Sequence, residues 1–332
     1  MRKKFLGLFI LGIGLVLFLA ACGGGSKPRI AIGPPASETN TTSKTILSAY
    51  GLGEDDYEEF QEGFGDAADG VQDGNIDISI GILGLPAGSI ESLQASAGDV
   101  VMLDLSDEAI NEIESNSDYK RYTIPQDTYD FLDSDIETIA AYAIMVANTD
   151  TIDEELGYEL TRIMVEHSSE ITHAQGAQMT LENALNGAEG IPIHPGAKRY
   201  YEEQGLTVDN PVAELSADAS NRKDEFVLGT GSQGGTYYPL GGEIANVWNN
   251  HLDTNYTNVE TGASVENLAT IGEGNMDLGM AVHVPTLAAV NGEGDFADNK
   301  VENVAFIGHI YPEVVQIVTR EATDITSLDD LK

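Results

Sequence analysis

The segment with the clearest chemical potential is a glycine-rich stretch, Gly229-Thr-Gly-Ser-Gln-Gly-Gly-Thr-Tyr-Tyr-Pro239, between a predicted strand and a predicted helix. Glycines let the backbone turn sharply and approach a ligand closely. The N–H groups at a helix start, with the hydroxyls of Ser232 and Thr236, can bind an anion. The segment therefore predicts capture of a carboxylate without an arginine.

The same stretch supports a second interpretation. Gly229, Gly231 and Gly234 satisfy the dinucleotide-binding pattern G-x-G-x-x-G, and Glu260 could hold a ribose hydroxyl. Against this, the helix is expected to start at Pro239, so additional loop stands where a dinucleotide fold is already helical. A nucleotide-dependent oxidoreductase stays the alternative function.

Other reactive side chains do not form a catalytic set. Ser232 and Ser264 do not fit the nucleophile pattern G-x-S-x-G. His167 and His173 are six residues apart on one predicted helix, about 240° around it, so they cannot share an ion. His283 follows a predicted strand and could border a cleft. We expect neither an enzyme nor a metal site.

The composition narrows the function classes. The 332 residues include 16 Lys and Arg against 55 Asp and Glu, a formal charge of −39, which excludes a basic nucleic-acid binder. The acids are spread over the whole chain, and such uniform acidity suits a high-salt habitat. With 42% apolar residues, one large or two mid-sized domains are expected.

The first 22 residues resemble an export signal. Three basic residues are followed by an apolar run from Phe5 to Ala21. The last three residues of this run, with the residue after it, read Leu-Ala-Ala-Cys22, which resembles a bacterial lipobox. This predicts a lipoprotein signal peptide over 1–21, a lipidated Cys22 and a spacer over 22–27. An uncleaved membrane anchor is the alternative, and both place the globular part outside the cytoplasm.

Strands and helices are expected to alternate in two blocks. Expected strands are 29–33, 76–82, 100–105, 136–146, 226–229, one near 259, 276–281 and 304–320. Expected helices are 43–50, 66–72, 87–95, 107–115, 153–173, 239–251, 265–271 and 286–290. This alternation implies two α/β lobes with parallel sheets. Residues 209–224 are polar and weakly periodic, as in a linker.

Three motifs in the second block are similar to those of the TAXI family of solute-binding proteins, the extracytoplasmic subunits of TRAP transporters. They are Gly234-Gly-Thr-Tyr-Tyr-Pro-Leu-Gly-Gly242, Thr261-Gly-Ala-Ser-Val-Glu-Asn-Leu268 and Tyr311-Pro-Glu-Val-Val-Gln316. In the first block, Ala31-Ile-Gly33 with Ser37 and Thr39, Gly84-Leu-Pro86 and Ile193-His-Pro-Gly-Ala-Lys-Arg-Tyr-Tyr201 match as well. The resemblance implies a type II periplasmic-binding-protein-like fold, with a ligand cleft between two α/β lobes.

The order of the two blocks departs from the family. Family members begin with the Gly-Gly-Thr-Tyr-Tyr half and continue from Ser-Leu-x-x-Leu-Lys into the strand that here starts near Pro28. The chain resembles a circular permutation, with lobe II at 28–146, lobe I at 147–332 and residues 209–224 joining the family's two ends. In this order we expect one covalent crossover between the lobes, near 147–151.

The resemblance implies a solute receptor that captures a small organic anion by lobe closure. An amino-acid or keto-acid carboxylate such as glutamate would be delivered to TRAP membrane permease subunits, with a lipid anchor, no cofactor and no nucleic acid. A sensor or adhesion subunit with the same fold is a further alternative. The expected ligand-binding residues are Ser232, Gln233, Gly234, Gly235, Thr236, Tyr237, Thr261, Ser264, Asn267 and His283 in lobe I, and Ser37, Thr39 and Gly84 in lobe II.

Several of these residues also have a purely structural interpretation. Ser264 is a good helix N-cap before Val265-Glu-Asn-Leu268, and a cap and a ligand contact can coexist. Ser37 and Thr39 could be turn residues beside two prolines. Asn267 could be a solvated first-turn residue, and Tyr237 a packed aromatic wall.

Overall fold

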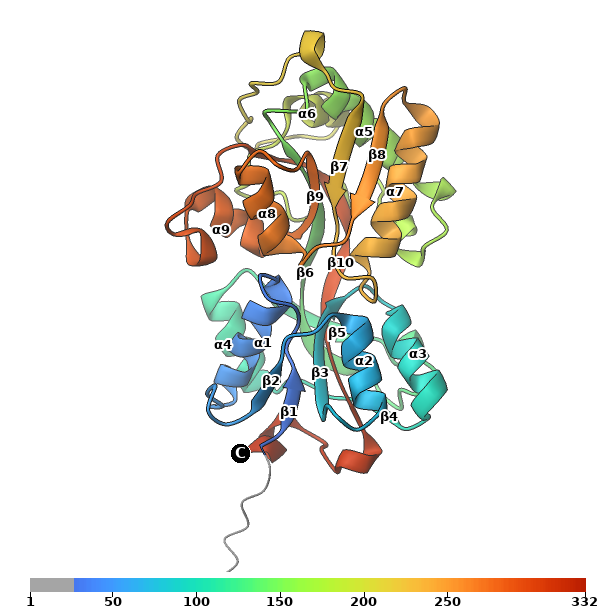
Figure 1. Cartoon of the computed structure of the whole chain (residues 1–332), viewed down its shortest axis with the longest axis vertical. Helices are drawn as coiled ribbons and strands as arrows, with labels where there is room; N and C mark the ends of the chain where they lie inside the picture. The colour runs from blue at the N-terminus through green and yellow to red at the C-terminus, as the bar shows by residue number, and fades with distance from the viewer. Residues whose placement is uncertain (1–26) are drawn as a thin grey trace, which may run out of the picture.

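The computed structural model describes residues 27–332, which form two α/β lobes joined by long strands (Figure 1). The expected signal peptide, Cys22 and nearly all of the spacer lie outside the described residues. Within 27–332, no helix combines the length and apolar character needed to cross a bilayer.

Lobe II is built mainly from the first block of the sequence. Its elements are β1 (Arg29–Ala31), α1 (Glu38–Ala49), β2 (Glu58–Phe60), α2 (Phe64–Gln72), β3 (Ile78–Leu83), α3 (Gly88–Ala97), β4 (Val100–Met102), α4 (Asp107–Asn116) and β5 (Lys120–Ile124). Lobe I contains α5 (Glu154–Glu166), α6 (Pro195–Glu203), β7 (Glu225–Gly229), α7 (Tyr237–His251), β8 (Asn255–Val259), α8 (Ser264–Gly272), β9 (Leu278–Val282) and α9 (His283–Asn291). Two long strands, β6 (Ile136–Asn148) and β10 (Val304–Arg320), belong to both lobes.

The strands form one continuous sheet in the order β2-β1-β3-β10-β6-β9-β7-β8, with β4 also paired to β10 and β5 to β6. The short strands of each lobe are parallel where helices connect them, as expected: β1 pairs with β2 and β3, and β7 with β8 and β9. The long strands β6 and β10 are antiparallel to each other and to their neighbours. The sheet is therefore mixed, which helix–strand alternation alone does not indicate.

Within the described residues the chain crosses between the lobes twice. Strand β6 pairs with β5 as far as Ala140 and with β9 from Ala143 onward, so it leaves lobe II and enters lobe I. Strand β10 runs the other way and pairs with β3 from Val314. The expected single crossover near 147–151 is wrong. The expected extent of lobe I, residues 147–332, is also wrong. The chain beyond about Pro312 packs in lobe II, where β10 pairs with β3.

Each lobe has its own hydrophobic core on both faces of its part of the sheet. In lobe I, α5 and α7 cover one face around the fully buried Trp248, while α6, α8 and α9 cover the other. In lobe II, α1 and α4 lie opposite α2 and α3 (Figure 1). The last turn of the chain, η7 (Leu328–Leu331), buries Leu328 in the same cluster as Ile30 of β1. Both ends of the described chain therefore belong to one core.

Some element boundaries differ from those expected. Helix α1 starts at Glu38, not near Ser43, because the Ser37 side chain accepts a hydrogen bond from the Asn40 N–H and caps it. Helix α5 ends at Glu166, well before the expected His173, with His167 as its C-cap. Strands β2 and β5 and helix α6 were not expected. Strand β2 is a short edge strand with two glutamates, so it lacks the apolar alternation by which a strand is predicted.

Candidate functional site

A cavity of about 30 Å³ lies between the lobes, near where β10 crosses from one lobe to the other. Seven of the expected residues line it together: Ser37 and Thr39 from lobe II, and Ser232, Gly235, Thr236, Tyr237 and Ser264 from lobe I. Residues of the two lobes that are more than 190 positions apart in the sequence thus line the same cavity. The cavity has room for about two water molecules, so an organic solute requires the lobes to move slightly apart.

The lobe II wall is the start of α1. Ser37 caps this helix, and its hydroxyl also donates to the Pro34 carbonyl over 2.6 Å. Glu38 follows and is 93% buried, with Oε1 accepting hydrogen bonds from Thr42 and Tyr119, each at 3.1 Å. Burial raises the pKa of Glu38 to about 7. This wall therefore offers a helix start and a carboxyl group that titrates near neutrality.

The lobe I wall is formed by the starts of α7 and α8. The glycine-rich loop leads into α7, which begins at Tyr237 rather than at Pro239. Helix α8 begins at Ser264, but the expected N-cap role of Ser264 is wrong: Ala263 occupies the cap position, and the Ser264 hydroxyl accepts from the Val282 N–H at 2.9 Å. The starts of two helices therefore lie at one cavity, with the positive ends of their dipoles beside it.

The floor of the cavity is strand β10 itself, through Tyr311 and Glu313. Glu313 is 97% buried; its Oε1 accepts from the Tyr311 hydroxyl at 2.5 Å, while its Oε2 has no hydrogen-bond partner. Burial raises the pKa of Glu313 to about 8. The Tyr237 hydroxyl also lies beside the Glu313 carboxyl and lowers its pKa, but it is too far away to form a hydrogen bond with Oε2. A buried carboxyl oxygen without a partner is energetically costly, unless a ligand supplies a hydrogen-bond donor or a positive charge.

The side chains around the cavity set its charge. Among the described residues that line it, none is lysine, arginine or histidine, whereas Glu38 and Glu313 both contribute carboxyl groups. The helix starts supply partial positive charge without a basic side chain. The site thus combines amide and hydroxyl donors on its walls with a carboxyl acceptor at its floor.

Direct contacts hold the lobes together around the cavity. The Gly84 N–H donates to the Thr236 hydroxyl at 3.0 Å, and the Glu266 N–H at the start of α8 donates to the Ala36 carbonyl at 3.1 Å. A Cβ atom added to Gly234 would lie 2.2 Å from the Gly65 backbone nitrogen, so the glycine loop lies directly against lobe II. The described conformation is therefore a closed one.

Six expected ligand residues do not line this cavity. Gln233, Gly234 and Thr261 border a neighbouring surface hollow, and Gly84 forms the interlobe contact with Thr236. Asn267 is fully buried, and its amide donates to the Thr230 and Met280 carbonyls, so it is not a solvated residue. His283 accepts from the Tyr142 N–H at 3.1 Å, beside the hinge strand β6.

The contacts of the glycine-rich loop before α7 test the interpretation of this loop as a dinucleotide site. Both carboxylate oxygens of Glu260 accept hydrogen bonds from Gln233, at 3.2 Å from its backbone N–H and 2.9 Å from its side chain. Glu260 is thus engaged within lobe I, and Gly65 occupies the approach to Gly234 where a pyrophosphate would lie. This arrangement does not favour a nucleotide.

The sequence-based set missed Glu38, Phe64, Tyr311 and Glu313. Glu313 did carry a signal, because it is the only acidic residue in the apolar run of β10. Glu38 is the first residue of its helix, where an acidic side chain is common for dipole reasons alone. Its position in sequence therefore gave no sign of a cleft role.

The architecture is that of a bilobal binding protein: two α/β lobes on a two-stranded hinge, closed over a small polar cavity. The chain belongs to the NMT1-like family, whose fold is periplasmic-binding-protein-like and whose model matches residues 25–205 and 228–332. The expected type II two-lobe fold class is thereby confirmed.

Three solved structures show similarity to this chain. An ancestral arginine-binding protein bound to arginine has 10% identity and a TM-score of 0.36, covering 92% of this chain and 91% of that chain. A phosphate-binding protein of a phosphate ABC transporter from Streptococcus pneumoniae has 10% identity and a TM-score of 0.39, with 93% and 100% covered. PhnD1 from Prochlorococcus marinus in complex with methylphosphonate has 9% identity and a TM-score of 0.41, with 90% and 78% covered.

Proposed function

We propose that the protein is an extracytoplasmic solute receptor that closes over a small α-amino acid and delivers it to a TRAP membrane permease. The observation that carries the proposal is the unpartnered Oε2 of Glu313 at the floor of the interlobe cavity. The raised pKa keeps Glu313 protonated near pH 7 when no solute is bound. A ligand ammonium group would lower that pKa and ionise Glu313, because it supplies both a hydrogen-bond donor and a compensating charge.

The rest of an amino acid fits the walls. Its carboxylate would accept hydrogen bonds from N–H groups at the starts of α1, α7 and α8, with the hydroxyls of Ser37 and Thr236 beside them. These groups belong to both lobes, and Glu313 lies on the hinge strand β10. The solute would therefore contact lobe I, lobe II and the hinge at once. Such a ligand distinguishes open from closed states and can therefore drive closure.

The permease partner and the membrane anchor are supported by sequence motifs. The Gly-Gly-Thr-Tyr-Tyr, Thr261–Leu268 and Tyr311–Gln316 motifs are similar to those of TAXI proteins, which work with TRAP permeases. The lipobox-like Leu-Ala-Ala-Cys22 supports a lipid anchor on the outer face of the cell membrane. We also propose that the two blocks are circularly permuted, since residues near both ends of the described chain share one core.

A matched ligand pair tests the choice of an amino acid over a keto acid. Isothermal titration with L-glutamate and with 2-oxoglutarate compares an ammonium group with a keto oxygen on one carbon skeleton. A panel of small amino acids run in parallel identifies the preferred side chain. We expect an amino acid to bind and its 2-keto counterpart to bind more weakly.

The substitution Glu313→Gln separates the two chemistries further. Without the carboxylate, a buried ammonium group has no counter-charge, so amino-acid affinity should fall by about 100-fold or more. A keto acid should be little affected, because a glutamine amide can donate to its keto oxygen. Glu108→Gln, an exposed acid on α4, serves as control and should change neither affinity. Tight keto-acid binding that survives Glu313→Gln, with no amino-acid binding, would overturn the amino-acid proposal.

A further inference from the structure

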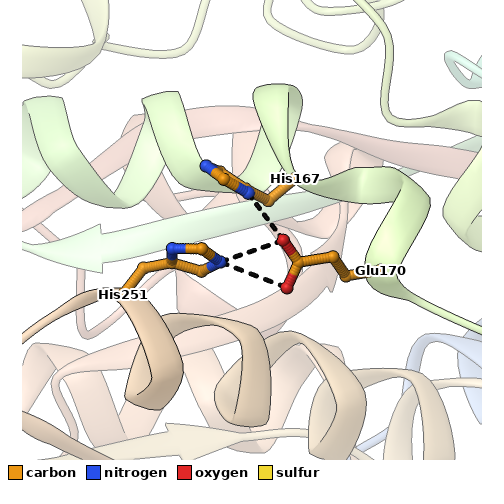
Figure 2. A group of neighbouring side chains, drawn as sticks. All are labelled: His167, Glu170 and His251. Atoms are coloured by element: carbon orange, nitrogen blue, oxygen red, sulfur yellow. Dashed lines mark hydrogen bonds and ion pairs between the residues drawn. The ribbon is translucent and has the colours of Figure 1, made fainter.

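A second group of polar side chains lies in lobe I, away from the cleft. It consists of His167, the C-cap of α5; Glu170, the last residue of η2 (Ser168–Glu170); and His251, the last residue of α7 (Figure 2). We name these three residues the His-Glu-His cluster. Helix α7 has 15 residues, so His251 is about 22 Å along the helix axis from the end that faces the cavity.

The three side chains converge on one point. His167 Nδ1 lies 2.7 Å from Glu170 Oε1, and His251 Nε2 lies 3.0 Å from Oε1 and 3.1 Å from Oε2. The two imidazole rings lie side by side, with centroids 3.8 Å apart. One potential ligand atom from each residue lies within 4.8 Å of the other two. Both histidines therefore direct a ring nitrogen at the same carboxylate.

From this geometry we propose that the His-Glu-His cluster is a binding site for a divalent transition-metal ion of the zinc type. Two imidazoles and one carboxylate form a common ligand set for Zn²⁺, with bonds of about 2.0–2.2 Å. Tetrahedral bonds of that length place ligand atoms about 3.3 Å apart. The 2.7–3.1 Å separations between the histidine nitrogens and the Glu170 oxygens need to widen by only a few tenths of an ångström.

The surroundings favour entry of a cation. The side chains of His167, Glu170 and His251 are 29%, 42% and 28% exposed, so an ion can reach them and keep water as a further ligand. Among residues 27–332, Glu170 forms ion pairs only with the two histidines, and no lysine or arginine competes for it. The overall charge of −39 also attracts cations.

The site would brace lobe I. The last turn of α7 is already held to α5 by the buried Trp248, whose indole N–H donates to the Leu160 carbonyl at 3.1 Å. A bound ion would add a link between the ends of the same two helices, because His251 is the last residue of α7 and His167 is the C-cap of α5. Metal binding is therefore expected to raise the unfolding temperature of the protein.

Titration of the chelator-treated protein with ZnSO₄ tests the proposal. We expect one equivalent of Zn²⁺ to bind with saturation and to raise the unfolding temperature. His251→Ala and Glu170→Gln should each weaken this binding by at least about tenfold, since loss of even an outer-shell partner costs that much.

Two control variants account for unspecific binding by the acidic surface. Glu166→Gln removes a neighbouring acid that pairs with Arg162, and His173→Ala removes a histidine outside the cluster. Both should bind Zn²⁺ like the unchanged protein. Co²⁺ supplies a second readout, because ligation by the cluster gives visible absorption bands that His251→Ala should abolish. The proposal is overturned if saturable Zn²⁺ binding is absent, or if all variants, each shown to be folded by circular dichroism, bind alike.

Discussion

The backbone N–H of Gly84 in lobe II donates a hydrogen bond to the side-chain hydroxyl of Thr236 in lobe I, over 3.0 Å. Thr236 immediately precedes α7, and Gly84 immediately follows β3, so the bond joins the two lobes at the edge of the cavity. It is one of a small set of polar contacts that the protein must break to open.

Removing this acceptor should favour open forms. Thr236→Val keeps the shape of the side chain but lacks the hydroxyl, so closure should be disfavoured by about 1 kcal/mol, or about fivefold in population. Small-angle scattering without added solute should then give a larger radius of gyration. Thr236→Ser keeps the hydroxyl and should match the unchanged protein. Equal radii for all three proteins would contradict a role for this bond in closure.

The buried Glu313 should make stability depend on pH. Its pKa is about 8 in the folded protein against an ordinary value of 4.5, so between these pH values the folded state holds a proton that the unfolded chain has lost. Raising the pH through this window therefore favours unfolding, by a few kcal/mol in total. Glu38 acts in the same direction up to about pH 7.

Glu313→Gln should remove most of that dependence. The unfolding temperature of the unchanged protein is expected to fall more steeply from pH 5 to pH 8 than that of the variant. At pH 8 the variant should be the more stable of the two. Glu108→Gln controls for the loss of one surface charge. Parallel curves for the unchanged protein and Glu313→Gln would show that Glu313 does not titrate as a buried group.

One strained backbone position lies in each lobe near the cavity. Ala36 in lobe II and Ala263 in lobe I have φ values of 55° and 71°, and in the described chain only Asp324 shares this property among non-glycine residues. Such a conformation costs about 1–3 kcal/mol and occurs often at functional sites. The Ala36 carbonyl accepts the interlobe hydrogen bond from the Glu266 N–H, so this strained residue takes part in closure.

Ala263→Gly should therefore stabilise the protein. Glycine adopts a positive φ readily, and relief of strain should exceed the entropy that glycine adds to the unfolded chain, for a net gain of about 1 kcal/mol. Thermal unfolding should shift upward by about 2 °C. Ala269→Gly, at an exposed position within α8, should shift it downward instead. A loss of stability in both variants would refute the strain.

The sequence predicted the alternating elements, because periodicity and turn residues are local signals. The serine and threonine residues expected at the cleft came from the resemblance to TAXI motifs; Ser37, Thr39, Ser232, Thr236 and Ser264 line the cavity, and Thr261 does not. It did not predict the pairing of β6 with β10, since apolar alternation does not say which strand lies beside which. For the same reason the crossover count was wrong. The His-Glu-His cluster escaped because His251 is 84 positions from His167, and only helix packing brings them together.

The two crossings lead to a test of the circular permutation that we propose for this chain. A variant that joins Lys332 to Pro28 through a short Gly-Ser linker and opens between Ala217 and Asp218 keeps both β6 and β10 intact. The opening also preserves the ion pair of Arg222 with Asp153. We expect this variant to fold, to bind the same solutes and to have the same ligand-free radius of gyration. Opening after Val315, inside the buried β10, should give insoluble protein; soluble, binding-competent protein from that opening would contradict the role of β10.

Because β6 and β10 are hydrogen-bonded to each other where they pass between the lobes, they bend as one ribbon. The relative motion of the lobes is then close to a single rotation. A substitution in the ribbon that stiffens or relaxes that rotation should scale the affinities of all solutes by one common factor. Substitutions in the cavity walls should instead change the order of affinities among the solutes. The hinge ribbon would thus set the overall affinity, and the walls would set the selectivity.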